Sequence, residues 1–310
     1  MLVGLLVLVI LAAGGGFAAY DAGYLDRFLC AGGECTAQDV LPPEELDLPR
    51  ARPARPVLEP ASGSAVSAAK VRAAVRPLLN DKALGKHVGF AVADLTHDRR
   101  VWGRGQGTFV PASTLKLFTS LAALHRIGPG ERFSTTVTRH GNRIVLVGGG
   151  DPYLASKPPK PGEHPYPRPA TIVELADRTA TALAKAGISS VRLGFDDSLF
   201  TGPAVNPRWE SDYVPSVTTP VSALWVDQGV SAKTGVRSTT PAQDAAKRFA
   251  HALRQRGLTV RGKLTRQVEH SDDVIAAVRS APLEQITQSL ITHSDNQAAE
   301  VVPRHLAIAA

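Results

Sequence analysis

Apolar residues recur at helical spacing over residues 110–124, written VPASTLKLFTSLAAL. A repeat of i, i+3, i+4 and i+7 places apolar side chains on one face of an α-helix. We therefore expect a helix whose apolar face is buried and whose N-terminal end lies among packed neighbours. The stripe has five members: Leu117, Phe118, Leu121, Ala122 and Leu124.

In the segment before this helix, apolar and polar residues alternate as they do in β-strands. A short helix over residues 70–79 precedes a strand over residues 88–95, and a turn at residues 97–100 leads to a second strand that starts at residues 101–103. The sequence thus predicts an antiparallel pair of strands that leads directly into the helix of residues 110–124.

Strand and helix patterns alternate beyond Gly130. Thr171 and Glu174 form a capping box at the start of one helix, and Gly187 ends it. The alternation predicts an α/β (α+β) fold. We expect strands at residues 133–138, 144–147, 191–195, 258–260 and 274–278, and helices at residues 171–187, 240–257, 282–292 and 297–306.

The length of 310 residues, with 44% hydrophobic residues, favours two domains or one domain with a large insert. The helix–strand units of residues 131–280 have the character of an inserted α/β region. Residues 69–130 and 281–310 would then form one domain around it.

The N-terminal part has a different composition. Residues 1–20 are apolar and uncharged, which predicts a signal anchor or a cleaved signal peptide, with the anchor favoured. Residues 21–68 form a Pro/Ala/Arg-rich linker. The two cysteines, Cys30 and Cys35, would form a local disulfide after export or remain free thiols.

The net charge of +7 suits a membrane surface or an anionic wall polymer as partner. No zinc-finger, RNP-type or helix-turn-helix pattern accompanies this charge, so nucleic acid is not an expected partner.

Ser113 and Lys116 stand one helical turn apart at the start of residues 110–124. A serine hydroxyl becomes a nucleophile when a base takes its proton, and a lysine amine serves as that base once desolvation or neighbouring cations lower its pKa. A second copy of the spacing, Ser67 and Lys70, shows that the pattern also arises without chemistry. An ordinary helix N-cap is the alternative for Ser113.

A second polar group, Ser294-Asp-Asn296, falls between two predicted helices. A hydroxyl and a carboxamide at such a turn can point into a cleft, although serine, aspartate and asparagine are also good helix caps. Lys233-Thr-Gly235 lies in a loop rich in serine, threonine and glycine rather than in a strand.

Ser113-x-x-Lys116 followed by Ser294-Asp-Asn296 is the motif order of the penicillin-recognising serine enzymes. With the long insert and the segments of residues 148–153, 195–202 and 220–227, the chain resembles the D-alanyl-D-alanine carboxypeptidase/endopeptidase family, the low-molecular-mass class C penicillin-binding proteins. The resemblance runs from about residue 69 to the last residue. It implies a β-lactamase/D,D-peptidase-like catalytic domain, an antiparallel sheet with helices, formed by residues 69–130 and 281–310.

The same resemblance implies the role of each residue. Ser113 would form an acyl-enzyme with a peptidoglycan peptide ending in D-Ala-D-Ala, and Lys116 would accept its proton. Ser294 would relay a proton to the leaving amine, and Asn296 would orient the substrate amide and Lys116. No cofactor and no metal is expected, and β-lactam antibiotics would be covalent inhibitors.

The chain departs from the family pattern in its third motif, Lys-Thr/Ser-Gly, which should follow Ser-x-Asn by a long stretch. The sequence ends fourteen residues after Asn296, and Lys233-Thr-Gly235 precedes Ser294, so we do not transfer the role to it. The expectation is therefore the front part of such an enzyme. Two alternatives stay open: a catalytically inactive, membrane-tethered remnant, and a class A β-lactamase, which an insert of about 150 residues disfavours.

Overall fold

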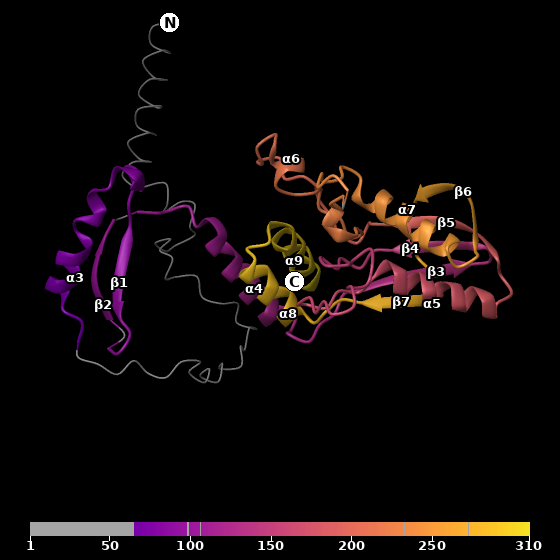
Figure 1. The fold of residues 1–310 in the computed structure, drawn as a ribbon, viewed down its shortest axis with the longest axis horizontal. Coiled ribbons are helices and arrows are strands. Elements are labelled where there is room, and N and C mark those ends of the chain that lie inside the picture. The colour runs from indigo at the N-terminus through magenta and orange to yellow at the C-terminus, as the bar shows by residue number, and fades with distance from the viewer. Residues whose placement is uncertain (1–64, 98, 106, 232, 272) are drawn as a thin grey trace, which may run out of the picture. The chain divides into compact units, whose positions relative to one another are not determined.

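The computed structural model describes residues 65–310 except residues 98, 106, 232 and 272 (Figure 1). The predictions for residues 1–20, for Cys30 and Cys35 and for most of the linker lie outside the described residues. Among the helices that are described, none has the length and apolar character needed to cross a bilayer. The chain forms two compact units, one ending at Thr108 and the other running from Phe109 to Ala310, and each is described by itself. The predicted limits of the α/β insert stay a prediction.

The described part of the first unit contains one helix and the predicted hairpin. Helix α3 (Ala68–Val75) precedes β1 (Phe90–Asp94) and β2 (Arg99–Arg104), which pair antiparallel. The rings of Phe90 and Trp102 meet edge to face, with centroids 4.9 Å apart. The hairpin prediction is confirmed, with the second strand beginning at Arg99, two residues before the expected position.

A five-stranded mixed sheet forms the body of the second unit, in the order β6-β5-β4-β3-β7 (Figure 1). β3 pairs antiparallel with β4 and with β7, whereas β5 lies parallel to both β4 and β6. The predicted strands are all present, although β6 is longer than expected. Their bounds are β3 (Ser134–His140), β4 (Arg143–Val147), β5 (Ser190–Asp196), β6 (Thr259–Arg266) and β7 (Val274–Arg279).

Two helices, α5 (Ile172–Lys185) and α7 (Pro241–Arg254), pack against each other and against this sheet. The N-cap bond of the predicted capping box is present: the Thr171 hydroxyl accepts a hydrogen bond of 3.1 Å from the backbone N–H of Glu174, while the Glu174 carboxylate binds Arg178. The apolar faces of sheet and helices close a continuous core. Its fully buried members include Val137, Ile144, Leu146, Leu175, Leu183, Phe249 and Leu253.

The segment Gly148–Gly150 after β4 passes close to other backbone. A Cβ at Gly149 would overlap the backbone of Ser134, and Gly150 adopts φ +73° against the ring of His305. The three glycines therefore serve a tight, close-packed turn.

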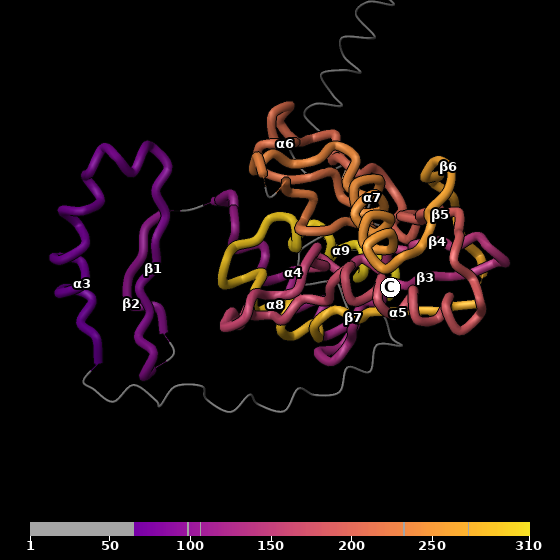
Figure 2. Tube along the Cα trace, turned by 45° about the vertical axis from the view of Figure 1, so that its right-hand side comes forward, coloured from indigo at the N-terminus to yellow at the C-terminus, as the bar shows by residue number. Residues whose placement is uncertain are grey.

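Three helices lie together at one end of the second unit, where both views place α4 beside α8 and α9 (Figures 1 and 2). They are α4 (Leu115–Arg126), α8 (Leu283–Thr292) and α9 (Asn296–Ala309). Elsewhere in the second unit, the sequence did not predict the short helix α6 (Tyr213–Ser216). The three helices α4, α8 and α9 share a core, and this core is smaller than that of the sheet. It contains Ala123, Phe133, Leu283, Ile286, Leu290, Ala298 and Val302.

The expected burial of the apolar stripe on α4 is wrong. Leu117 is 53% exposed, and Phe118 and Leu121 are each 67% exposed. The buried side chains of α4 are Ser120 and Ala123. Small residues let the backbones of packed helices approach closely, so α4 meets its neighbours with its small residues and turns the leucine stripe outward.

Candidate active site

Ser113 lies in a 3₁₀ turn (Ala112–Thr114) immediately before α4. The turn is held in a conformation with φ +47° at Ala112, which an alanine rarely adopts. Lys116 follows on the first turn of α4, and its Nζ lies 3.1 Å from Ser113 Oγ. The short turn and the helix spacing together bring the Ser113 hydroxyl and the Lys116 amine within hydrogen-bond distance.

The Ser294-Asp-Asn296 turn joins α8 to α9 and faces the same point. Ser294 also has a left-handed backbone, φ +50°, and its Oγ lies 2.8 Å from Ser113 Oγ. Asn296 opens α9, and its Oδ1 lies 2.7 Å from Lys116 Nζ, while Ser294 Oγ lies 3.4 Å from the same nitrogen. Asp295 caps α9 by accepting from the backbone N–H groups of Gln297 and Ala298.

The structure therefore brings all four predicted site residues together. The second copy of the spacing behaves differently: Ser67 is the N-cap of α3, and its Oγ accepts from the backbone N–H of Lys70. The N-cap position of α4 is Thr114, which makes no side-chain cap bond, and Ser113 lies one residue earlier. The capping alternative thus describes Ser67 and does not describe Ser113.

A cavity of about 370 Å³ surrounds Ser113 and Lys116. Two of its polar lining residues, Tyr213 and Glu300, were not found from the sequence. Burial raises the pKa of the Glu300 carboxyl, and the cations of Arg304 and Lys116 oppose that shift. Glu300 lies four residues after Asn296 on α9, so helical spacing is the signal that could have placed it on the same face.

The site is more open than the sequence suggested. Ser113 is exposed and Lys116 is half-buried, because the apolar residues that follow Lys116 on α4 point outward. The expected burial of this helix end is therefore wrong.

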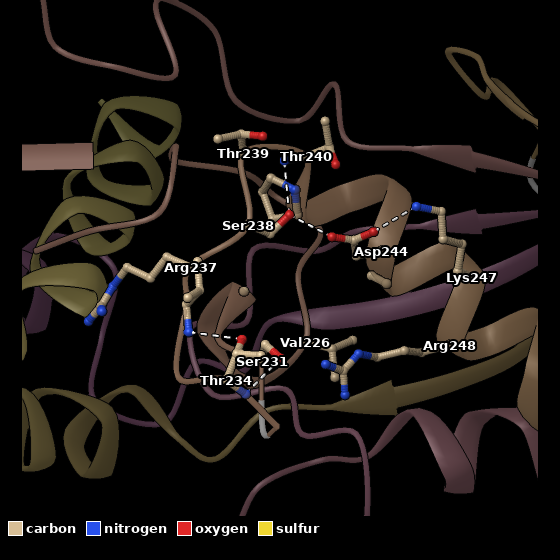
Figure 3. Close-up of a pocket in the computed structure, with 14 residues that line it drawn as sticks. Val226, Ser231, Thr234, Arg237, Ser238, Thr239, Thr240, Asp244, Lys247 and Arg248 are labelled. Atoms are coloured by element: carbon tan, nitrogen blue, oxygen red, sulfur yellow. Dashed lines mark hydrogen bonds and ion pairs between the residues drawn. The ribbon is translucent and has the colours of Figure 1, made fainter. Parts of the chain in front are cut away.

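Lys233-Thr-Gly235 does not join the cavity at Ser113. Thr234 lines a separate cavity of about 590 Å³ beside the start of α7, with Ser238, Asp244 and Arg248 (Figure 3). Over the described part of the chain, no grouping of His, Cys, Asp and Glu side chains is suited to holding a metal ion.

Comparison with known proteins identifies the chain's relatives. The model of the D-Ala-D-Ala carboxypeptidase 3 (S13) family matches residues 71–237 and 231–310. Carboxypeptidase Rv3627c of Mycobacterium tuberculosis is 34% identical over 252 residues, which are 78% of this chain and 53% of that protein. The D-alanyl-D-alanine carboxypeptidase of Actinomadura sp. is 32% identical over 206 residues, which are 62% of this chain and 35% of that protein.

The fold has a counterpart among solved structures. Penicillin binding protein 4 from Haemophilus influenzae superposes with a TM-score of 0.57 at 18% identity, covering 71% of this chain and 62% of that one. This likeness confirms the predicted fold class. The chain spans about half the length of the mycobacterial carboxypeptidases it matches. Because the family model covers most of the described sequence, the chain belongs to the D-Ala-D-Ala carboxypeptidase 3 (S13) family.

Proposed function

We propose that this chain carries the acylation site of a serine-type D-alanyl-D-alanine carboxypeptidase that acts on peptidoglycan stem peptides. The observation that carries the proposal is the position of Lys116 Nζ, which lies within 3.4 Å of Ser113 Oγ, Ser294 Oγ and Asn296 Oδ1. Two of these partners stand 178 and 180 residues away in the sequence, so helix spacing alone does not produce the cluster.

In the first step, Ser113 Oγ attacks the carbonyl carbon of the D-Ala-D-Ala bond. As a new oxygen–carbon bond forms, the proton of Ser113 passes to Lys116 Nζ, 3.1 Å away, a step that requires Lys116 in its uncharged amine form. Asn296 Oδ1 accepts a hydrogen bond from Lys116 and fixes the direction of the nitrogen lone pair. The hydrogen-bond contact between Ser113 and Lys116 supports this step.

In the second step, the carbon–nitrogen bond breaks and the leaving amine takes up a proton. Ser294 Oγ contacts both Ser113 and Lys116, so it can pass the proton from the Lys116 ammonium to the departing D-alanine. Water then attacks the acyl-enzyme, releases the shortened peptide and restores the Ser113 hydroxyl. A β-lactam would follow the first step, because its ring amide presents the same type of carbonyl.

Fluorescent penicillin tests the nucleophile. The 310-residue chain should form a covalent adduct whose labelled peptide contains Ser113, and Ser113→Ala should remove it. Ser67→Ala is the matched control, because Ser67 has the same spacing to a lysine but caps α3, and its adduct yield should equal that of the wild type.

Release of free D-alanine from a peptide ending in D-Ala-D-Ala tests the substrate class. Cleavage of cross-linked muropeptides, read by chromatography of the products, tests the further proposal of endopeptidase action. A folded chain that neither binds penicillin covalently nor releases D-alanine would contradict the proposal and favour the inactive, peptide-binding alternative. Rapid turnover of penicillin would instead favour a β-lactamase.

We also propose that the protein acts outside the cytoplasmic membrane, with residues 1–20 as an anchor or signal. The support is the uncharged apolar composition of this segment and the +7 charge of the chain. A reporter enzyme that is active only after export, fused after residue 68, should be active with residues 1–20 present and inactive without them.

A further inference from the structure

The side-chain amide of Gln297 joins α9 to the loops of residues 218–237. Gln297 is only 2% exposed, and its Oε1 accepts from the backbone N–H of Thr219 at 3.0 Å and from Arg237 Nε at 2.8 Å. Its Nε2 donates to the backbone oxygen of Gln228 at 2.7 Å. Both ends of the amide are therefore used by one connected set of loops.

Arg237 lines the neighbouring cavity of about 590 Å³ and also reaches α9. Figure 3 shows its side chain extended away from Asp244 and Lys247, towards the ribbon that has the colour of the C-terminal helices. Its partner there is Gln297 on α9. The donor is a charged guanidinium and the acceptor is a buried, neutral amide oxygen. Such a charge-assisted hydrogen bond is stronger than one between two neutral groups.

Gln228 makes a second contact on the other side of Asn296. Its Nε2 donates to Asp295 Oδ2 at 2.7 Å, while Asp295 Oδ1 accepts from the backbone N–H of Gln297 and caps α9. Asp295 and Gln297, the two neighbours of Asn296, are thus both held by Gln228. Asn296 itself contacts Lys116.

The backbone dihedral angles are unusual both at the proposed site and in the loop that contacts Asp295 and Gln297. Among the described residues, the non-glycine residues with positive φ are Ala112, Asp227, Gln228 and Ser294. Ala112 precedes Ser113, Ser294 belongs to the proposed site, and Asp227 and Gln228 lie in the loop that contacts Asp295 and Gln297. Such conformations persist where the surrounding contacts over-determine them.

We propose that Gln228 and Gln297 are positioning residues for acylation: by holding both neighbours of Asn296, they fix Asn296 Oδ1 against Lys116 Nζ and so aim the amine at Ser113. The inference rests on the proposed acylation of Ser113. Its physical basis is that a displacement of about 1 Å in a reacting group costs about 100-fold in rate. Neither glutamine is among the residues that line the cavity at Ser113, so neither is expected to contact substrate.

The acylation rate constant and the dissociation constant of the initial penicillin complex separate positioning from binding and from folding. Gln297→Ala should lower the acylation rate constant at least tenfold and change the dissociation constant less than twofold. In stopped-flow labelling, the folded fraction changes only the amplitude of the signal. The acylation rate constant is therefore independent of how much of the variant is folded. Gln288→Ala is the matched control, because Gln288 is exposed on α8 and bonds Tyr166 rather than the turn.

A second measurement does not require an active Ser113. Acetylation of lysines with acetic anhydride, read by peptide mass spectrometry, should modify Lys116 several-fold faster in Gln297→Ala than in the wild type or in Gln288→Ala. If penicillin fails to label Ser113 in the wild type, the proposed function is wrong. The acetylation rates of Lys116 then still test whether Gln297 positions Lys116. Equal Lys116 reactivity in all three proteins, or an unchanged acylation rate constant in Gln297→Ala, would overturn the positioning role.

Discussion

Apolar side chains packed on the sheet of the second unit are buried, whereas those along helix α4 are largely exposed. Phe249 on α7 is fully buried against the sheet core, whereas Phe118 on α4 is 67% exposed. Both side chains belong to stripes of helical period. The difference indicates that the α/β body is held by its apolar core. The proposed site at the start of α4 is held instead by polar contacts of Lys116 and by a face of small residues around Ala123.

The largest expected effect comes from exchanging the two phenylalanines for alanine. Phe249→Ala should lower the free energy of unfolding by about 3–5 kcal/mol, because it removes a large side chain and leaves a cavity. Phe118→Ala should change it by less than about 0.5 kcal/mol, since the ring is already in water. Urea denaturation of both variants measures the contrast, and similar losses would show that α4 is packed as tightly as α7.

A buried carboxyl gives the next largest effect. Asp151 is 4% exposed, and its Oδ2 has no hydrogen-bond partner. Burial raises the pKa of this carboxyl to about 7, and the bond from the backbone N–H of Tyr153 only partly offsets the shift. A raised pKa in the folded state means that the folded protein binds this proton more tightly than the unfolded chain does.

The sign follows from linkage. The contribution of Asp151 to stability is fully present below its ordinary pKa of 3.8 and is lost as the pH rises towards and through about 7. Asp151→Asn should therefore be more stable than the wild type at pH 8, by roughly 2–4 kcal/mol, and similar to it at pH 4. Thermal unfolding at both pH values measures this; Asp212→Asn, at an exposed carboxyl, should show no such difference.

The N-terminal ends of α5 and α7 are expected to differ less in their contribution to the free energy of unfolding. The hydroxyl of Thr171 caps α5, whereas neither α4 nor α7 has a side-chain cap. Thr171→Ala should cost about 1 kcal/mol of unfolding free energy because a backbone N–H loses its partner. Thr240→Ala at the start of α7 removes no cap bond and should cost only a few tenths. Equal losses in chemical denaturation would mean that the cap bond adds nothing.

The smallest effect is expected on the outer face of α4. Leu121→Gln replaces an exposed leucine by a residue of similar helix propensity, so the unfolding free energy should change by less than about 0.5 kcal/mol. A loss of about 2 kcal/mol or more would show that this face is covered in solution. Circular dichroism during urea denaturation is sufficient to distinguish the two results.

Local patterns were sufficient wherever neighbours in sequence decide the structure. The sequence was sufficient to predict the hairpin of β1 and β2, the N-cap at Thr171, and the order of most helices and strands. Ser113 and Lys116 were also readable as a pair, because a 3₁₀ turn and one helical turn fix their separation.

Sequence pattern alone determined which elements form and which residue types could react, because backbone periodicity and turn chemistry act over a few residues. Only the tertiary structure decided which face of α4 is packed, since Ser120 and Ala123 allow the close approach that larger side chains prevent. It also brought Asn296 to Lys116 across 180 residues, placed Glu300 in the lining of the same cavity, and joined Gln297 to Thr219 and Arg237. Those contacts depend on how α9 meets α4 and the loops of residues 218–237, which no local pattern encodes.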